Sequence, residues 1–199
     1  MSVEDKPMLN REQARALLAF ARQEIAHALY APKGTVQPDS LPDDPVFREK
    51  WAVFVTLSKR QVLRGCIGSL VAVESLAESV RRNAVNAALH DPRFPPLTLQ
   101  ELENVHIEIS VLGVPQLLPY SDTQHLLAQL EPGRDGLILQ GPSGARATFL
   151  PQVWRQLPAA ADFLSALCRK AGLAADAWKR GGISYQRYRV ESYEEEGGR

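Results

Sequence analysis

The chain has 199 residues, 45% of them hydrophobic, which is enough apolar material for a sizeable core without help from disulfides or metal ions. Lysine plus arginine and aspartate plus glutamate both total 23, so the net charge does not attract nucleic acid or an anionic membrane. We therefore expect neither a nucleic-acid partner nor a membrane partner.

The first third of the chain predicts a helix, a loop and a hairpin. Apolar residues at helical spacing, with Asn10 as a cap, predict a helix over 10–30. Four prolines predict a long surface arm or loop without regular structure over 31–50. The apolar run 51–57 predicts an interior strand covered on both faces, and a turn at 58–61 leads into a second strand.

The middle of the chain predicts a helix, a rigid corner and a strand. The predicted helix 74–89 has one apolar side and, on the other, an uncharged polar stripe of Ser79, Asn83, Asn86 and His90. Prolines then end this helix, and the residues 98–101 have the capping-box spacing of a short helix. Strict alternation over 105–111 predicts a strand with His106, Glu108 and Ser110 on the face away from the core.

The last third predicts helices at 122–130 and 159–171, hairpin strands at 136–140 and 145–150, a helical turn at 151–154 and a strand at 183–193. Residues 194–199 predict a frayed acidic tail. Strand pairs and helices without regular alternation indicate an α+β fold, with a mainly antiparallel sheet flanked by helices. We expect one domain over 1–199.

The most informative segment is LRGCIG at 63–68, which places Cys66 between two glycines. Gly65 and Gly68 could let a ligand approach the sulfur, and Arg64 would share a strand face with Cys66 and stabilise a thiolate. The alternative is a small buried hydrophobe, with glycines that serve a bulge or close helix packing. Both interpretations stay open here.

Charged residues near this segment offer further candidates. His90 and His106 each accompany a carboxylate, Asp91 or Glu108, that can orient an imidazole or hold its proton. Glu108 lies in mid-strand, where it is either exposed or paired with an arginine such as Arg64 or Arg93. Arg93 could clamp a carboxylate or phosphate of a ligand, or tie down its own loop through Asp91.

These considerations give two sets of candidate site residues. The candidate catalytic residues are Cys66, Arg64, Glu108 and His90. The candidate ligand-binding residues are Gly65, Gly68, Asn83, Asp91 and Arg93. Cys168 lies on an apolar helical stripe and is predicted to be structural. Two cysteines without a CxxC pair predict free thiols in the cytoplasm, and no residue cluster predicts a metal or a cofactor.

Several short motifs in one order resemble the AMMECR domain family. They are FVTL at 54–57, LRGCIG at 63–68, DPRF at 91–94, IEISVL at 107–112, LPQVW at 150–154 and KAGL at 170–173. The resemblance covers roughly residues 10 to 194, although the turn at 58–61 lacks the usual glycine and the proline-rich arm is unusual. It implies a larger and a smaller lobe, with a cleft near the cysteine motif, but no established reaction.

Prokaryotic members of this family, called AmmeMemoRadiSam system protein A, are often encoded beside a Memo-like protein and a radical SAM protein. The resemblance therefore implies these two proteins as partners. Two hypotheses follow for function. The chain is either an enzyme or enzyme component that uses thiolate chemistry at Cys66 on a small or peptide-like substrate, or a non-catalytic binding or scaffold module for a partner protein or modified product.

Overall fold

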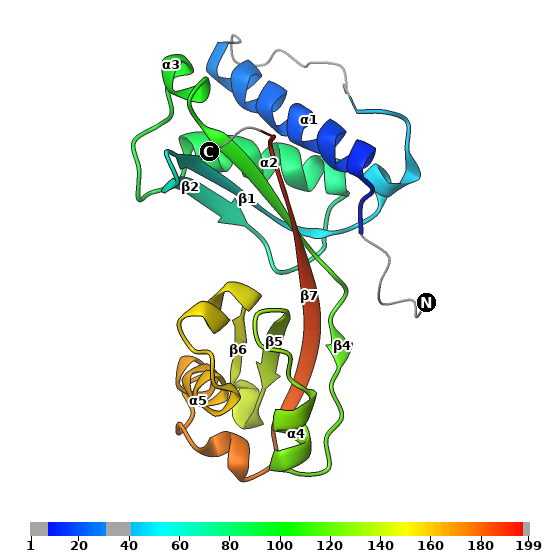
Figure 1. The fold of residues 1–199 in the computed structure, drawn as a ribbon, viewed down its shortest axis with the longest axis vertical. Coiled ribbons are helices and arrows are strands. Elements are labelled where there is room, and N and C mark those ends of the chain that lie inside the picture. Colours follow the sequence, from blue (N-terminus) through cyan, green and yellow to red (C-terminus); the bar gives the residue numbers. More distant parts are fainter. Residues whose placement is uncertain (1–7, 31–40, 197–199) are drawn as a thin grey trace. The chain divides into compact units, whose positions relative to one another are not determined.

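The computed structural model describes residues 8–30 and 41–196, and the chain forms two compact units within it. Of the described residues, 8–30, 41–112 and 191–196 form the first unit, and 113–190 form the second. The first unit contains α1 (Arg11–Tyr30), η2 (Pro45–Arg48), β1 (Ala52–Lys59), β2 (Val62–Gly68), α2 (Leu76–Leu89), α3 (Leu99–Leu102) and β3 (His106–Leu112), coloured blue to green in Figure 1.

The second unit contains β4 (Gln116–Leu117), α4 (Thr123–Gln129), β5 (Asp135–Gln140), η3 (Pro142–Gly144), β6 (Arg146–Phe149), η4 (Pro151–Arg155), α5 (Ala160–Lys170) and η5 (Ala177–Lys179). The last strand, β7 (Ser184–Glu194), begins in the second unit and ends in the first. All the strand pairings described are antiparallel and helices accompany both sets of strands, which confirms the predicted α+β class.

Helices α1 and α2 pack on each other and cover one face of the strands in the first unit. Val53, Val55 and Leu57 of β1 are fully buried under them, as are Ile107 and Ile109 of β3. The residues between these positions on β1 are only half-buried, so the prediction that 51–57 is covered on both faces is wrong. One face of this sheet is the core face, and the other carries the polar residues discussed below.

Local sequence signals explain where the helices begin. Asn10 and Gln13 each accept a hydrogen bond from the other's backbone N–H at 2.9 Å, which starts α1 as predicted. Thr98 and Glu101 form the predicted capping box of α3. Capping by these side chains satisfies backbone N–H groups that the first helical turn leaves without partners.

Part of the predicted arm has regular structure. Residues 31–40 of the arm lie outside the described residues. In 41–50, where we expected none, Pro45–Arg48 forms the 3-10 helix η2. Asp44 accepts a hydrogen bond from the Val46 N–H, and proline at the first helical position needs no backbone donor. Proline therefore starts a helix here instead of breaking one.

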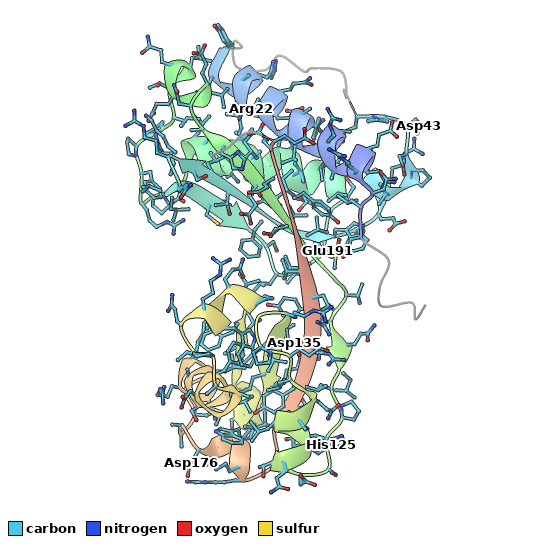
Figure 2. The ribbon with its side chains drawn as sticks, viewed as in Figure 1. Arg22, Asp43, His125, Asp135, Asp176 and Glu191 are labelled. Carbon is cyan, nitrogen blue, oxygen red and sulfur yellow. The ribbon has the colours of Figure 1, made fainter. Side chains whose placement is uncertain are left out.

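The second unit has its own core. Trp154 and Phe163 stack with ring centroids 3.9 Å apart, and the predicted structural residue Cys168 is fully buried beside them in the same cluster. Asp135, labelled in Figure 2, is also fully buried and lies 3.4 Å from Arg189. Burial is the main reason that the pKa of this carboxyl is raised.

The described part of the predicted acidic tail is bound to the first unit. Glu195 forms an ion pair of 2.6 Å with Arg22 of α1, which is labelled in Figure 2, and its N–H donates to the Ile107 carbonyl. These contacts hold 194–196 against α1 and β3, whereas 197–199 lie outside the described residues. Across the described residues, no helix is both long and apolar enough to cross a bilayer.

Candidate functional site

Cys66 lies on the polar face of the sheet in the first unit. Its side chain is partly exposed, and it stands directly opposite Thr56 on the neighbouring strand β1. The Thr56 hydroxyl donates a hydrogen bond to the Cys66 sulfur at 3.4 Å. Thr56 also stands directly opposite Glu108 on β3, so the three side chains form a row across three strands.

An ion pair fixes the backbone of Cys66 from the outer edge of β2. The Cys66 N–H donates to Asp91 at 2.9 Å, and the Arg93 guanidinium donates to the Cys66 carbonyl at 3.1 Å. Arg93 also binds both carboxylate oxygens of Asp91, at 2.9 and 2.7 Å. Of the two alternatives for Arg93, the structure therefore shows the tie through Asp91.

The ion pair between Asp91 and Arg93 shifts the pKa of both side chains. The side chain of Asp91 is only 2% exposed, and its hydrogen bonds with Arg93 hold the pKa of the carboxyl well below its usual range. The pKa of Arg93 is raised, chiefly by Asp91 and to a smaller extent by Cys66. Arg93 thus bridges Asp91 and the backbone carbonyl of Cys66.

Arg64 does not take the place beside Cys66 that the sequence predicts. Its guanidinium binds Glu101 of α3 at 3.1 and 3.3 Å, and Lys59 binds the same carboxylate. The hydrogen bond from Arg64 is the main reason that the pKa of Glu101 falls to about 2. The register of β1 and β2 shifts between Leu57 and Ser58, and this irregularity interrupts the alternation on which the prediction depended.

The two glycines of the motif serve packing within the chain. A side chain at Gly65 would collide with the backbone carbonyl of Ala87 in α2, and one at Gly68 would collide with Phe54. The space left by the missing side chains is therefore filled by the protein itself. Close helix packing, one of the alternatives, accounts for Gly65, whereas Gly68 makes room for Phe54 of the neighbouring strand β1.

Glu108 has no arginine partner among the described residues, contrary to one of the two alternatives for it. Its carboxylate accepts a hydrogen bond from the Ser110 hydroxyl at 3.1 Å, and the hydroxyls of Ser110 and Ser192 lie 2.9 Å apart. Ser110 is buried and Glu108 is partly exposed. The carboxylate is therefore held in place without a neutralising cation.

Among the described residues, the remaining candidates form no hydrogen bond with Cys66, Thr56 or Glu108. The His90 side chain is exposed at the end of α2 and makes no hydrogen bond within the part of the chain that the structure describes. His106 instead lies 3.4 Å from Glu194. Asn83 was predicted to bind ligand from a polar helix side, but it is 2% exposed and donates to the Val53 carbonyl. It ties α2 to β1.

Chemically, the site offers a partly exposed thiol, a hydroxyl that donates to it and a carboxylate on the same sheet face. A thiol can act as a nucleophile when neighbouring groups stabilise its anion and a nearby group accepts its proton. Within the described residues, no three side chains of His, Cys, Asp or Glu gather as a metal site would require.

Thr56, Glu101 and Ser192 were not identified from the sequence. Thr56 is a polar residue within an apolar run, but only the strand register reveals that it faces Cys66. Glu101 was recognised as a helix cap, a role that did not indicate its second bond to Arg64. Ser192 is far from Ser110 in sequence, and no local pattern joins them.

Comparison with known proteins gives the family. The sequence profile of AMMECR1 matches residues 18–193. This chain belongs to the AMMECR1 family. A protein of Thermofilum pendens is 38% identical over 94% of this chain and 92% of its own length, and one of Methanothermobacter thermautotrophicus is 37% identical over 95% and 97%.

A solved structure supports the same assignment. The crystal structure of an uncharacterised protein from Pyrococcus horikoshii superposes with a TM-score of 0.77, at 34% sequence identity, and covers 96% of this chain and 95% of that protein. The resemblance stated from the short motifs is therefore confirmed. Membership of the AMMECR1 family establishes the fold of the chain, but it assigns no reaction to Cys66.

Proposed function

We propose that this AMMECR1-family chain is an enzyme, or a component of one, in which Cys66 is a reactive thiol that acts on a small or peptide-like substrate. The observation that carries the proposal is the hydrogen bond from Thr56 to the Cys66 sulfur. A hydroxyl that donates to sulfur is a favourable partner for the anionic form of a thiol, which is the nucleophilic form.

The surrounding residues give this chemistry a defined geometry. Asp91 and Arg93 hold the Cys66 backbone at its N–H and its carbonyl, so the thiol projects from a fixed position. Glu108, on the same face beyond Thr56, is the carboxylate that accepts the proton of the thiol through bridging water molecules. In this proposal Arg64 supports α3 and the hairpin through Glu101, and His90 takes no part.

The proposed setting follows from the resemblance and from composition. We place the activity in the cytoplasm, where two free cysteines remain reduced. The proposed partners are a Memo-like protein and a radical SAM protein, as the resemblance to AmmeMemoRadiSam system protein A implies. Such partners would supply or consume the substrate that Cys66 attacks.

Differential alkylation of the two cysteines tests the proposal. The folded protein is treated with iodoacetamide at neutral pH, and modification of Cys66 and Cys168 is followed by peptide mass spectrometry. We expect Cys66 to react at least tenfold faster than Cys168, and Thr56→Val to slow Cys66 several-fold because the donor to sulfur is lost. Thr123→Val, a half-buried threonine in the second unit, is the matched control and should change neither rate.

Equal and slow alkylation of both cysteines would reject a reactive thiol at Cys66. The hypothesis of a non-catalytic binding or scaffold module would then be the one that fits the chain. If Cys66 reacts fast but Thr56→Val leaves its rate unchanged, exposure alone explains the reactivity and the role given to Thr56 is wrong.

A further inference from the structure

The charges around Cys66 are unequally neutralised. Arg93 binds the carboxylate of Asp91 through two of its three nitrogens, and Arg64 and Lys59 both bind Glu101. Glu108 lies on the same sheet face as Cys66, and within the described part of the chain it has no cationic partner. Glu108 is therefore a carboxylate on this face that no described cation neutralises, although the sequence motif suggests a positive environment.

The Glu108 carboxylate is also held in a defined orientation. Ser110 is 3% exposed, and its hydroxyl lies between Glu108 and Ser192, at 3.1 Å from the carboxylate and 2.9 Å from the second hydroxyl. A buried donor of this kind fixes one carboxylate oxygen and leaves the other available. The Glu108 carboxylate is therefore more restricted than that of a glutamate whose only partner is water.

The spacing of the strands relates this carboxylate to the thiol. Cys66, Thr56 and Glu108 are directly opposite one another on three adjacent strands. Neighbouring strands lie about 4.8 Å apart, so Cys66 and Glu108 are separated by roughly 10 Å. This distance fits a substrate that places a charged group at Glu108 while its reacting atom reaches the sulfur.

We propose that Glu108, positioned by Ser110 and Ser192, binds a positively charged amine or guanidinium group of the substrate that reaches Cys66. This inference rests on the proposed function and names the chemical class of its substrate. A carboxylate with one oxygen still available suits an ammonium or guanidinium group, which carries several N–H donors, and a single charged ligand is too few for a metal ion.

Methanethiosulfonate reagents of opposite charge test the inference. A trimethylammonioethyl reagent and a sulfonatoethyl reagent each form a mixed disulfide with Cys66 and release methanesulfinate. Their rates at Cys66 are measured by peptide mass spectrometry at low ionic strength, on the wild-type chain and on Glu108→Gln. We expect the ratio of the cationic to the anionic rate to fall about fourfold in Glu108→Gln, as a unit charge at roughly 10 Å in water implies.

A matched variant controls for net charge. Glu103→Gln removes the same charge from an exposed position after α3, and it should leave the ratio within about 1.5-fold of wild type, since the ratio responds to charges near Cys66. High salt should abolish the difference between Glu108→Gln and wild type, because the effect is electrostatic.

The outcomes separate the inference from the proposed function. If Cys66 reacts readily but Glu108→Gln leaves the ratio unchanged, or changes it no more than Glu103→Gln does, the cation site is overturned and the reactive thiol stands. If Cys66 reacts with neither reagent in the folded chain, the proposed function fails, and the substrate class inferred from it fails too.

Discussion

At the scale of single residues, Asp91 is the group on which the position of Cys66 depends. Its buried carboxylate accepts hydrogen bonds from the Cys66 N–H and from Arg93. The sequence named both residues and offered the tie between them as one of two alternatives. The bond to the Cys66 backbone could not be predicted, because it joins residues 25 positions apart at the edge of β2.

Asp91→Asn should lower the free energy of unfolding by about 1–3 kcal/mol, because a buried charged acceptor of four donors is replaced by a neutral amide. This expected loss of stability is smaller than the loss for a fully buried ion pair, because the Arg93 side chain is 53% exposed. Urea denaturation at neutral pH measures the change. Asp162→Asn, an exposed position in α5, should change stability by less than about 0.5 kcal/mol. Equal effects at the two positions would contradict this role for Asp91.

Gly65→Ala tests the packing role of the first motif glycine. The added methyl group would collide with the Ala87 carbonyl, so α2 and β2 must move apart. We expect a loss of about 1–3 kcal/mol, typical of overpacking in a tight interior, measured by urea or thermal unfolding. An unchanged midpoint would show that the close approach of α2 does not require glycine.

At the scale of elements, the β1–β2 hairpin has a turn whose sequence does not suit its geometry. Arg60 and Gln61 both have positive φ, 51° and 63°, which is the geometry of a type I′ two-residue turn. Non-glycine residues are strained in this region. The chain therefore makes a turn that favours glycine, although the sequence has no glycine at these two positions.

Gln61→Gly should raise the free energy of unfolding by about 0.5–1 kcal/mol, because glycine relieves the strain of the positive φ. Gln100→Gly, at an exposed position in α3, is the matched control and should lower stability by up to about 1 kcal/mol. Both are measured by urea unfolding. Destabilisation by Gln61→Gly would mean that the side chain of Gln61 contributes more than the strain removes.

Elements with strong periodicity or caps could be predicted from sequence, and strand register could not. The helices α1, α2 and α3 begin within two residues of the predicted positions, since their caps are encoded locally. The irregular register between β1 and β2 displaced Arg64 from the predicted site. The prediction that Asn83 lies on the side of α2 away from the core was wrong. A polar side chain on a helix can face solvent, but it can also form a hydrogen bond with a backbone carbonyl inside the core, as Asn83 does.

At the scale of the whole molecule, acidic groups in both units tie stability to pH. Arg64 lowers the pKa of Glu101 to about 2, Arg93 lowers that of Asp91, and Arg189 lowers that of Glu131 in the second unit. A carboxyl with a depressed pKa in the folded state stabilises the fold above its ordinary pKa, and this contribution is lost as the pH falls through the depressed value. Asp135, with a raised pKa, acts in the opposite direction.

Glu101→Gln isolates one of these groups. The Glu101 side chain is 26% exposed. After allowance for screening by solvent, we expect its ion pair to contribute about 1–2 kcal/mol to the free energy of unfolding at neutral pH. The difference in unfolding free energy between wild type and Glu101→Gln should shrink as the pH falls from about 4.5 to about 2. Urea unfolding of both proteins across this range provides the measurement, and a difference that stays constant with pH would contradict the ion pair with Arg64 as its origin.

The most direct measurement of the reactive thiol compares one cysteine with itself. The alkylation rate of Cys66 is measured in the folded chain and in the same chain unfolded in urea, at the same pH and reagent concentration. If Thr56 and the fixed backbone make Cys66 reactive, the folded chain should alkylate Cys66 at least as fast as the unfolded chain, while Cys168 should be strongly protected by its burial. Protection of Cys66 by tenfold or more in the folded state would contradict a reactive thiol at this position.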